Sequence, residues 1–128
     1  MDPGARAKTC LVVDDSRVMR LMAAGIMVNL GFTVQEAEDG MSAVALCEKR
    51  IPDLVLLDWH MPVMNGMQFM EALRKLPGGA DACVVFCTTE NDVDNIRSAV
   101  ASSANEYVMK PFDRDILNRK LTRLGMIP

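Results

Sequence analysis

The sequence predicts an α/β fold in which five parallel strands form one doubly wound sheet, with five helices on its two faces. Short apolar runs alternate along the chain with longer segments whose apolar residues recur at helical spacing. Parallel strands need crossover connections, and these are nearly always right-handed. We therefore expect the helices to cover both faces of the sheet.

The first half of the chain contains three of the expected strands and two of the helices. Thr9–Val13 and Leu54–Asp58 are apolar almost throughout, as central strands buried on both faces should be. Thr33–Ala37 contains polar residues and is expected at an edge of the sheet. Helices are expected at Ser16–Leu30 and Gly40–Lys49. The residues expected on the apolar face of the first helix are Val18, Leu21, Met22, Gly25 and Ile26.

The second half continues the same alternation. A helix is expected at Gly66–Lys75, where Met67, Met70 and Leu73 share one face and fill the core. Strands are expected at Cys83–Thr88 and Glu106–Met109, and helices at Asp92–Ser102 and Asp113–Leu124.

Length and composition favour one intracellular domain. The 128 residues suffice for one core, at about residues 9–124, and leave no room for a separate effector domain. The net charge of -3, without a long basic run, argues against nucleic acid as a direct partner. No apolar run approaches the roughly 20 residues that cross a membrane, and no secretory signal is present, so a cytoplasmic protein is expected. Buried reduced thiols are expected at Cys10, Cys47, Cys83 and Cys87.

Acidic residues follow two of the expected strands, at the edge where a parallel sheet binds ligands. Asp14 and Asp15 come directly after the first strand, and Asp58 ends the third. The Asp14–Asp15 pair also admits a purely structural role, because Asp is a good N-cap for the helix that follows. A buried carboxylate such as Asp58 needs a cation or hydrogen-bond donors. Clustered carboxylates with room for water suit Mg²⁺.

Two further strand ends supply a cation and a hydroxyl. Lys110 follows the last strand, and its ammonium can pair with a carboxylate or with a phosphate group. Thr88 ends the fourth strand, and its hydroxyl can donate to a phosphoryl oxygen, although threonine is also simply common in strands.

Five motifs in order, LVVDDS, AEDG, LLDWHMPVMNG, TTE and EYVMKPF, resemble those of receiver domains of two-component response regulators. The chain is most similar to the stand-alone, CheY-like members, which have a flavodoxin-like fold, and the resemblance covers roughly residues 9–124. It implies that Asp58 is the phosphoacceptor and that Asp14, Asp15 and Asp58 bind Mg²⁺ together with the backbone carbonyl of His60. It further implies that Lys110 and Thr88 contact the phosphoryl group.

The resemblance also implies how the signal leaves the pocket. Thr88 and Tyr107 occupy the switch positions, which would reshape the face formed by residues 92–102, 106–109 and 113–124. Tyr107 also admits a plain reading as a half-exposed strand aromatic. The family commonly has a cis peptide at the position of Lys110–Pro111. His60 and Glu90 flank the expected path of the attacking water, and we expect them to tune the lifetime of the phosphorylated state.

Three outputs remain open for a chain that acts as a switch rather than as a turnover enzyme. The first is a monomeric chemotaxis-type regulator, phosphorylated by a histidine kinase, that binds a flagellar switch component. The second is a phosphorelay intermediate or phosphate sink that exchanges phosphoryl groups with kinases or a histidine phosphotransferase. The third is a receiver that binds an anionic nucleotide through a basic helix, which also has a plain helix-dipole explanation. The basic residues of that helix are Arg114, Arg119, Lys120 and Arg123.

Overall fold

Five parallel strands form a single sheet in the spatial order β2-β1-β3-β4-β5, which confirms the doubly wound α/β prediction. The structure is a computed structural model that describes residues 8–61, 63–89, 92, 94, 97 and 104–128. The strands are β1 (Thr9–Val13), β2 (Thr33–Ala37), β3 (Leu54–Asp58), β4 (Cys83–Thr88) and β5 (Glu106–Met109). The helices are α1 (Arg17–Asn29), α2 (Gly40–Lys49), α3 (Gly66–Lys75), the short 3-10 helix η1 (Gly79–Asp81) and α5 (Arg114–Arg123).

The helix expected at Asp92–Ser102 lies largely outside the described residues. The other four predicted helices are present, and their ends agree with the expected ends to within one residue. Strand β2 lies at one edge of the sheet, as its polar residues predicted, and β1 and β3 lie inside it.

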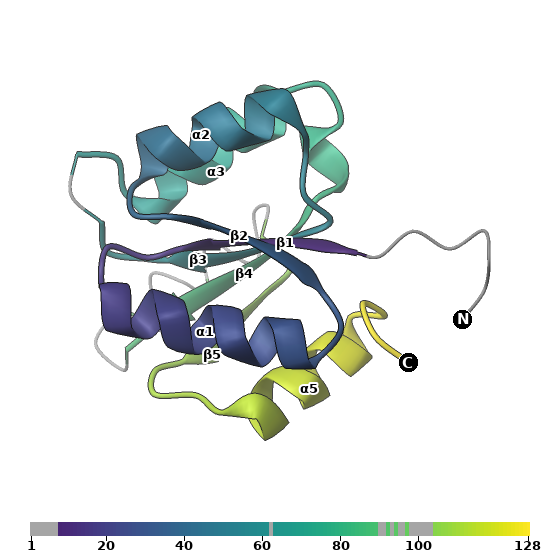
Figure 1. Ribbon diagram of the computed structural model, residues 1–128. Helices are drawn as coiled ribbons and strands as arrows, with labels where there is room; N and C mark the ends of the chain where they lie inside the picture. The colour runs from purple at the N-terminus through teal and green to yellow at the C-terminus, as the bar shows by residue number, and fades with distance from the viewer. Residues whose placement is uncertain (1–7, 62, 90–91, 93, 95–96, 98–103) are drawn as a thin grey trace.

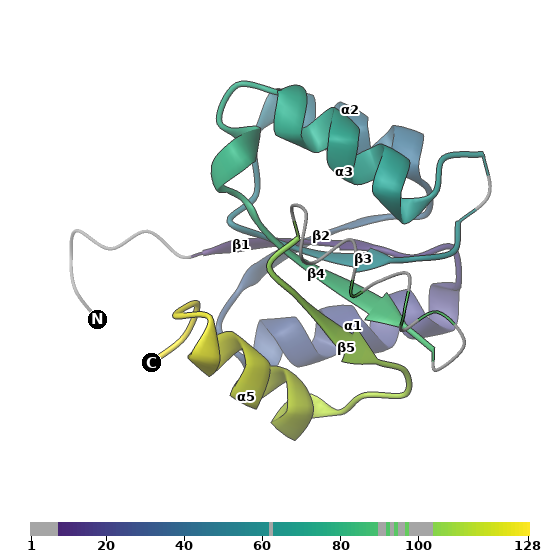
Figure 2. The ribbon, with the colours of Figure 1, turned by 180° about the vertical axis from the view of Figure 1, so that it is seen from behind.

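The helices form two layers, one on each face of the sheet. Figures 1 and 2 show α2 and α3 on one face and α1 and α5 on the other. Alternate residues of each central strand point to opposite faces. Leu11 and Val13 therefore pack under α2 and α3, whereas Cys10 and Val12 pack under α1 and α5. The central strands are thus buried on both faces, and this packing fixes the position of their carboxyl ends.

The predicted apolar face of α1 is wrong except at Ile26, which packs against the core; Gly25 is exposed. Val18, Leu21 and Met22 are 77%, 50% and 38% exposed, whereas Ala23, Ala24 and Met27 are buried. Both sets have helical spacing, so periodicity alone did not separate them. Small alanines let the helix backbone approach the sheet closely, and the bulkier residues are left on the outer side. The result is an exposed apolar strip on α1 beside the carboxyl edge.

The four cysteines are free and buried, as predicted. Burial raises the pKa of the Cys47 thiol to about 11 and that of Cys87 to about 12. Among the described residues, no helix combines the length and apolar character that crossing a membrane requires.

Candidate functional site

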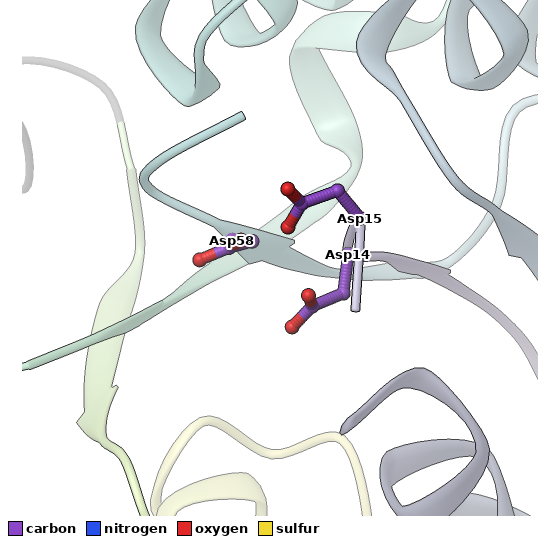
Figure 3. A group of neighbouring side chains, drawn as sticks. All are labelled: Asp14, Asp15 and Asp58. Atoms are coloured by element: carbon purple, nitrogen blue, oxygen red, sulfur yellow. The ribbon is translucent and has the colours of Figure 1, made fainter. Parts of the chain in front are cut away.

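Three carboxylates meet at the carboxyl edge of the sheet. Val13 of β1 is paired with Leu57 of β3, so Asp14, the residue after β1, and Asp58, the last residue of β3, lie side by side. Figure 3 shows the side chains of Asp14 and Asp15 pointing toward the side on which Asp58 lies. Oxygen atoms from the three residues lie within 4.8 Å of one another. Strand order reverses between β1 and β3, and such a switch point is where open α/β sheets bind ligands.

The acidic pair does not cap helix α1. Ser16 is the N-cap, and its side chain accepts a hydrogen bond from the backbone N–H of Met19. Asp14 Oδ1 accepts from the backbone N–H of Ser16 at 2.9 Å, which orients the carboxylate as the chain leaves β1. Asp14 is 6% exposed and Asp58 7%, whereas Asp15 is exposed. One end of the cluster is therefore open to solvent.

Lys110 joins the two buried carboxylates. Its Nζ donates to Asp14 Oδ2 at 2.8 Å and to Asp58 Oδ1 at 3.0 Å. The backbone N–H of Lys110 donates to the carbonyl of Thr88, which extends the β4–β5 pairing to the pocket. The peptide bond between Lys110 and Pro111 is cis.

Within the described part of the chain, Lys110 is the one cation paired with the side chains of this three-carboxylate cluster. Burial raises the pKa of Asp58 to about 6; Lys110 works against this rise, and the charges of Asp14 and Asp15 add to it. Burial opposes the charge on Lys110 as well, but the hydrogen bond to Asp14 and the charge of Asp58 outweigh it, so the pKa of the ammonium is raised. Both pKa values rise, so the neutral form of Asp58 and the charged form of Lys110 are favoured. Three oxygen-bearing acids with unneutralised negative charge fit a hard divalent cation such as Mg²⁺.

The two predicted switch residues lie at different depths. Thr88 is 2% exposed at the end of β4, and its hydroxyl donates to the carbonyl of Thr89 at 3.2 Å. Tyr107 is half-buried on β5, where Lys120 Nζ of α5 lies 5.3 Å from the centre of its ring. Lys120 also lies 3.5 Å from Glu106. Tyr107 therefore belongs to the β5–α5 surface and Thr88 to the pocket.

A cavity of about 300 Å³ opens over the acidic cluster. Besides Asp15, Asp58, Thr88 and Lys110, it is lined by Trp59, His60, Thr89 and Asp92. His60 Nε2 lies 2.8 Å from Asp92 Oδ2, so a contact between these two side chains spans this opening. Glu90, the other residue predicted to tune the phosphorylated state, lies outside the described residues.

Sequence reasoning missed Asp92 as a site residue. Its place in the sequence indicated only the start of a helix, and nothing in the spacing from His60 indicates that the two side chains meet. Trp59 was also missed, although its position directly after Asp58 is a usable signal. Its ring packs edge-on against Phe86, with ring centres 5.0 Å apart, which fixes the wall of the cavity.

Curated relatives match this chain over most of their own length. The chain is 34% identical over 110 residues to the chemotaxis protein CheY of Bacillus subtilis, which covers 85% of this chain and 90% of that protein. It is 33% identical over 115 residues to the chemotaxis protein CheY-3 of Vibrio cholerae, covering 89% and 88%.

Solved structures and a family model agree with these relatives. The chemotaxis protein CheY4 of Vibrio cholerae superposes with a TM-score of 0.85 at 30% identity, covering 92% of this chain and 98% of that one. The family model described as the response regulator receiver domain matches residues 10–122, a span that contains the acidic cluster, Thr88 and Lys110. The chain therefore belongs to the response regulator receiver domain family.

Proposed function

We propose that this chain is a single-domain response regulator that accepts a phosphoryl group on Asp58 from a phosphohistidine of a histidine kinase or phosphotransferase. The observation that carries the proposal is the buried Asp58 carboxylate, held 3.0 Å from the Lys110 ammonium and clustered with Asp14 and Asp15. The cavity above it has room for a phosphoryl group and a metal ion.

The chemistry is covalent nucleophilic catalysis by a carboxylate. An ionised oxygen of Asp58 forms a bond to phosphorus while the bond between phosphorus and the imidazole nitrogen of the donor breaks, and the electron pair returns to that nitrogen. Lys110 then has a phosphoryl oxygen as an additional partner for its ammonium. Mg²⁺ held by Asp14, Asp15, Asp58 and the carbonyl of His60 would supply the further positive charge that phosphoryl transfer needs.

The phosphorylated residue is part of the protein itself, so the chain acts as a switch and not as a turnover enzyme. Phosphorylation adds negative charge and acceptor oxygens beside Thr88. A shift of that hydroxyl toward the new oxygens would alter the end of β4, which is hydrogen-bonded to β5 and hence to the surface that carries Tyr107.

The test uses acetyl phosphate as a small phosphodonor, with mass spectrometry of the intact protein and of its peptides. We expect one phosphoryl group on Asp58 that requires Mg²⁺ and is absent from Asp58→Asn. Asp81→Asn, a change in the short helix η1 far from the pocket, is the matched control and should be modified like the wild type. A phosphoryl group on any other residue, or none on the wild type, would reject the proposal.

For the output we propose a chemotaxis role, in which the phosphorylated chain binds a component of the flagellar switch. Two relatives named as chemotaxis proteins each match nearly their whole length, which supports this output. The β5–α5 surface is formed in part by Tyr107, Glu106 and Lys120, whose side chains contact one another.

The output is tested by affinity capture from lysate of the native cell. The bait is the chain with Mg²⁺ and beryllofluoride, which mimics the phosphoryl group, and Asp58→Asn is the control. Selective recovery of flagellar switch protein would support the chemotaxis output. Recovery of kinases or a phosphotransferase without any switch component would assign the chain to a phosphorelay.

The exposed apolar strip of α1 favours the phosphorelay role, the second candidate output. Val18, Leu21 and Met22 lie on the helix that begins two residues after Asp15, so a partner bound there would reach the pocket. A helical domain that carries a phosphohistidine is the partner that a phosphorelay requires. Rapid return of the phosphoryl group from Asp58 to such a domain would distinguish the relay from the chemotaxis output.

The nucleotide alternative has less support from the described residues. Lys120 lies beside Glu106, and Arg114 donates to Asn29, so these two basic groups already have partners. The observation in favour of this alternative is a hollow of about 170 Å³ lined by Ile116, Arg119, Lys120 and Arg123.

A further inference from the structure

Four residues form a connected series of polar contacts across the mouth of the cavity: His60, Asp92, Thr89 and Thr88. His60, on the loop after β3, contacts Asp92 Oδ2 at 2.8 Å, and the hydroxyl of Thr89 donates to the same oxygen at 3.4 Å. The backbone N–H of Asp92 donates to the carbonyl of Thr89 at 3.1 Å. That carbonyl also accepts from the hydroxyl of Thr88 at 3.2 Å.

This series keeps the hydroxyl of Thr88 occupied. Its single proton is donated to Thr89, so it is not available to a phosphoryl oxygen on Asp58 unless the hydrogen bond to Thr89 is broken. The Thr89 carbonyl is in turn held by Asp92, and the Asp92 carboxylate is held from the opposite loop by His60.

The burial of the two partners indicates which one depends on the other. The side chain of Asp92 is 12% exposed, whereas the imidazole of His60 is 74% exposed. A buried carboxylate loses more by losing its partner than an exposed imidazole does. His60 therefore positions Asp92, and Asp92 positions Thr89, the residue that follows β4.

We propose that the His60–Asp92 contact is a clasp that holds the end of β4 in the arrangement of the unphosphorylated protein. A phosphoryl group on Asp58 then gains the Thr88 hydroxyl only when the hydrogen bond from that hydroxyl to the Thr89 carbonyl is broken. The inference rests on the proposed function of Asp58, and it makes His60 and Asp92 positioning residues. Because a ligand shifts an equilibrium only through its different affinities for the two states, weakening the clasp should strengthen apparent binding of a phosphoryl mimic.

The first test measures the affinity for beryllofluoride at saturating Mg²⁺ by the fluorescence of Trp59, the only tryptophan of the chain. His60→Ala and Asp92→Ala are each expected to raise the apparent affinity by about two- to fivefold, the size of one hydrogen bond with an exposed partner. The double variant should bind no more tightly than the better single variant, because each change removes the same contact. Glu48→Ala, at an exposed position of α2, is the control and should bind like the wild type.

The design separates the clasp from simple access to the pocket. If His60→Ala acted only by opening the cavity, its effect would persist in the Asp92→Ala background and the two changes would add. Additive effects, or unchanged or weaker binding in both single variants, would overturn the proposal. Since His60 is exposed, its alanine variant should fold even if Asp92→Ala does not.

A second measurement needs neither metal nor phosphoryl mimic. Hydrogen exchange of the Asp92 amide, followed by NMR in metal-free protein, reports on its hydrogen bond to Thr89. His60→Ala should speed this exchange by about two- to fivefold, and an unchanged rate would overturn the clasp. Failure of the proposed function looks different, because wild type and Asp58→Asn would then respond identically to beryllofluoride.

Discussion

Asp58 combines a buried carboxylate with a raised pKa, and this combination determines how the pocket responds to protons. Its pKa rises from the ordinary 3.8 to about 6, mainly through burial. The folded protein therefore binds this proton more tightly than the unfolded chain does. Ionisation of Asp58 therefore lowers the free energy of unfolding progressively as pH rises from about 4 to about 6. Above pH 6 this destabilisation is constant.

Replacing Asp58 by Asn should therefore stabilise the metal-free protein at neutral pH. We expect the free energy of unfolding at pH 7.5 to rise by about 1–2 kcal/mol, after allowing for partial solvent screening. The gain should vanish below pH 4, where the wild-type carboxyl is protonated in both states. Urea denaturation in EDTA at the two pH values measures it, and Glu48→Gln on exposed α2 is the control. A variant less stable than wild type at pH 7.5 would contradict the assigned pKa.

Protons should also compete with Mg²⁺ at Asp58. Because a metal ligand must be deprotonated, the apparent affinity for Mg²⁺ should fall about tenfold between pH 7 and pH 5. Titration with Mg²⁺ followed by Trp59 fluorescence measures the change. In Asp58→Asn, this proton is absent, and the corresponding pH dependence should be lost. An affinity that is constant in the wild type would mean that Asp58 does not bind the metal.

At the scale of the elements, helix α3 begins directly against the acceptor strand, at Gly66. The N-cap Asn65 and Gln68 form a capping box that fixes the start of the helix. A Cβ on Gly66 would lie 2.7 Å from the Phe86 ring and 2.9 Å from the backbone oxygen of Asp58. The lack of a side chain thus lets the helix start directly against the strand that carries the acceptor.

Gly66→Ala should therefore destabilise the fold and disturb the acceptor. We expect a loss of about 1–3 kcal/mol in the free energy of unfolding, typical of overpacking, and weaker Mg²⁺ binding. Gly25→Ala is the matched control, because a Cβ there meets nothing within 4 Å and the helix gains from alanine. Thermal and urea unfolding of both variants compare the two sites. Equal effects would show that the close approach at Gly66 is unimportant.

The outer strip of α1 should matter for partners and not for stability. Leu21→Ser, at a 50% exposed position, is expected to change the free energy of unfolding by less than about 0.5 kcal/mol. It should slow phosphotransfer from a histidine phosphodonor domain and leave the reaction with acetyl phosphate unchanged. Met41→Ser, at an exposed position on α2, is the control. A loss with both donors would place the effect in the pocket instead.

For the molecule as a whole, the pocket couples metal binding to the stability of the sheet. Asp14 follows β1 and Asp58 ends β3, and these two strands are paired at four residues between two buried layers. A ligand that binds only the folded state stabilises it by mass action. Neutralising the cluster should therefore stabilise the entire domain.

Mg²⁺ at tenfold its dissociation constant should raise the free energy of unfolding by about 1.4 kcal/mol, and the melting temperature by about 3–6 °C. EDTA should reverse the rise. Asp58→Asn should show little of it, whereas Glu48→Gln should behave like the wild type. Thermal unfolding with and without Mg²⁺ tests this, and an equal shift in Asp58→Asn would place the stabilising ion elsewhere.

Most of the fold followed from the sequence because the central strands are apolar without interruption and the helices are periodic. The same rules failed on α1, where two stripes had helical spacing and alanines formed the buried one. The strand ends also predicted Asp14, Asp15, Asp58, Thr88 and Lys110, since the carboxyl ends of parallel strands must meet. No such rule predicts the position of Asp92, because its contact with His60 is made between segments far apart in the sequence.

By itself, the sequence determined the sheet, its edge strand and the acids and lysine that meet at its carboxyl edge. These features depend on periodicity and strand direction, which are local properties of the chain. Only the tertiary structure decided which side of α1 is buried, how far the pKa of Asp58 rises, and that His60 contacts Asp92. Those outcomes depend on packing, on desolvation and on distances between loops that are remote in the sequence, and no local pattern encodes them.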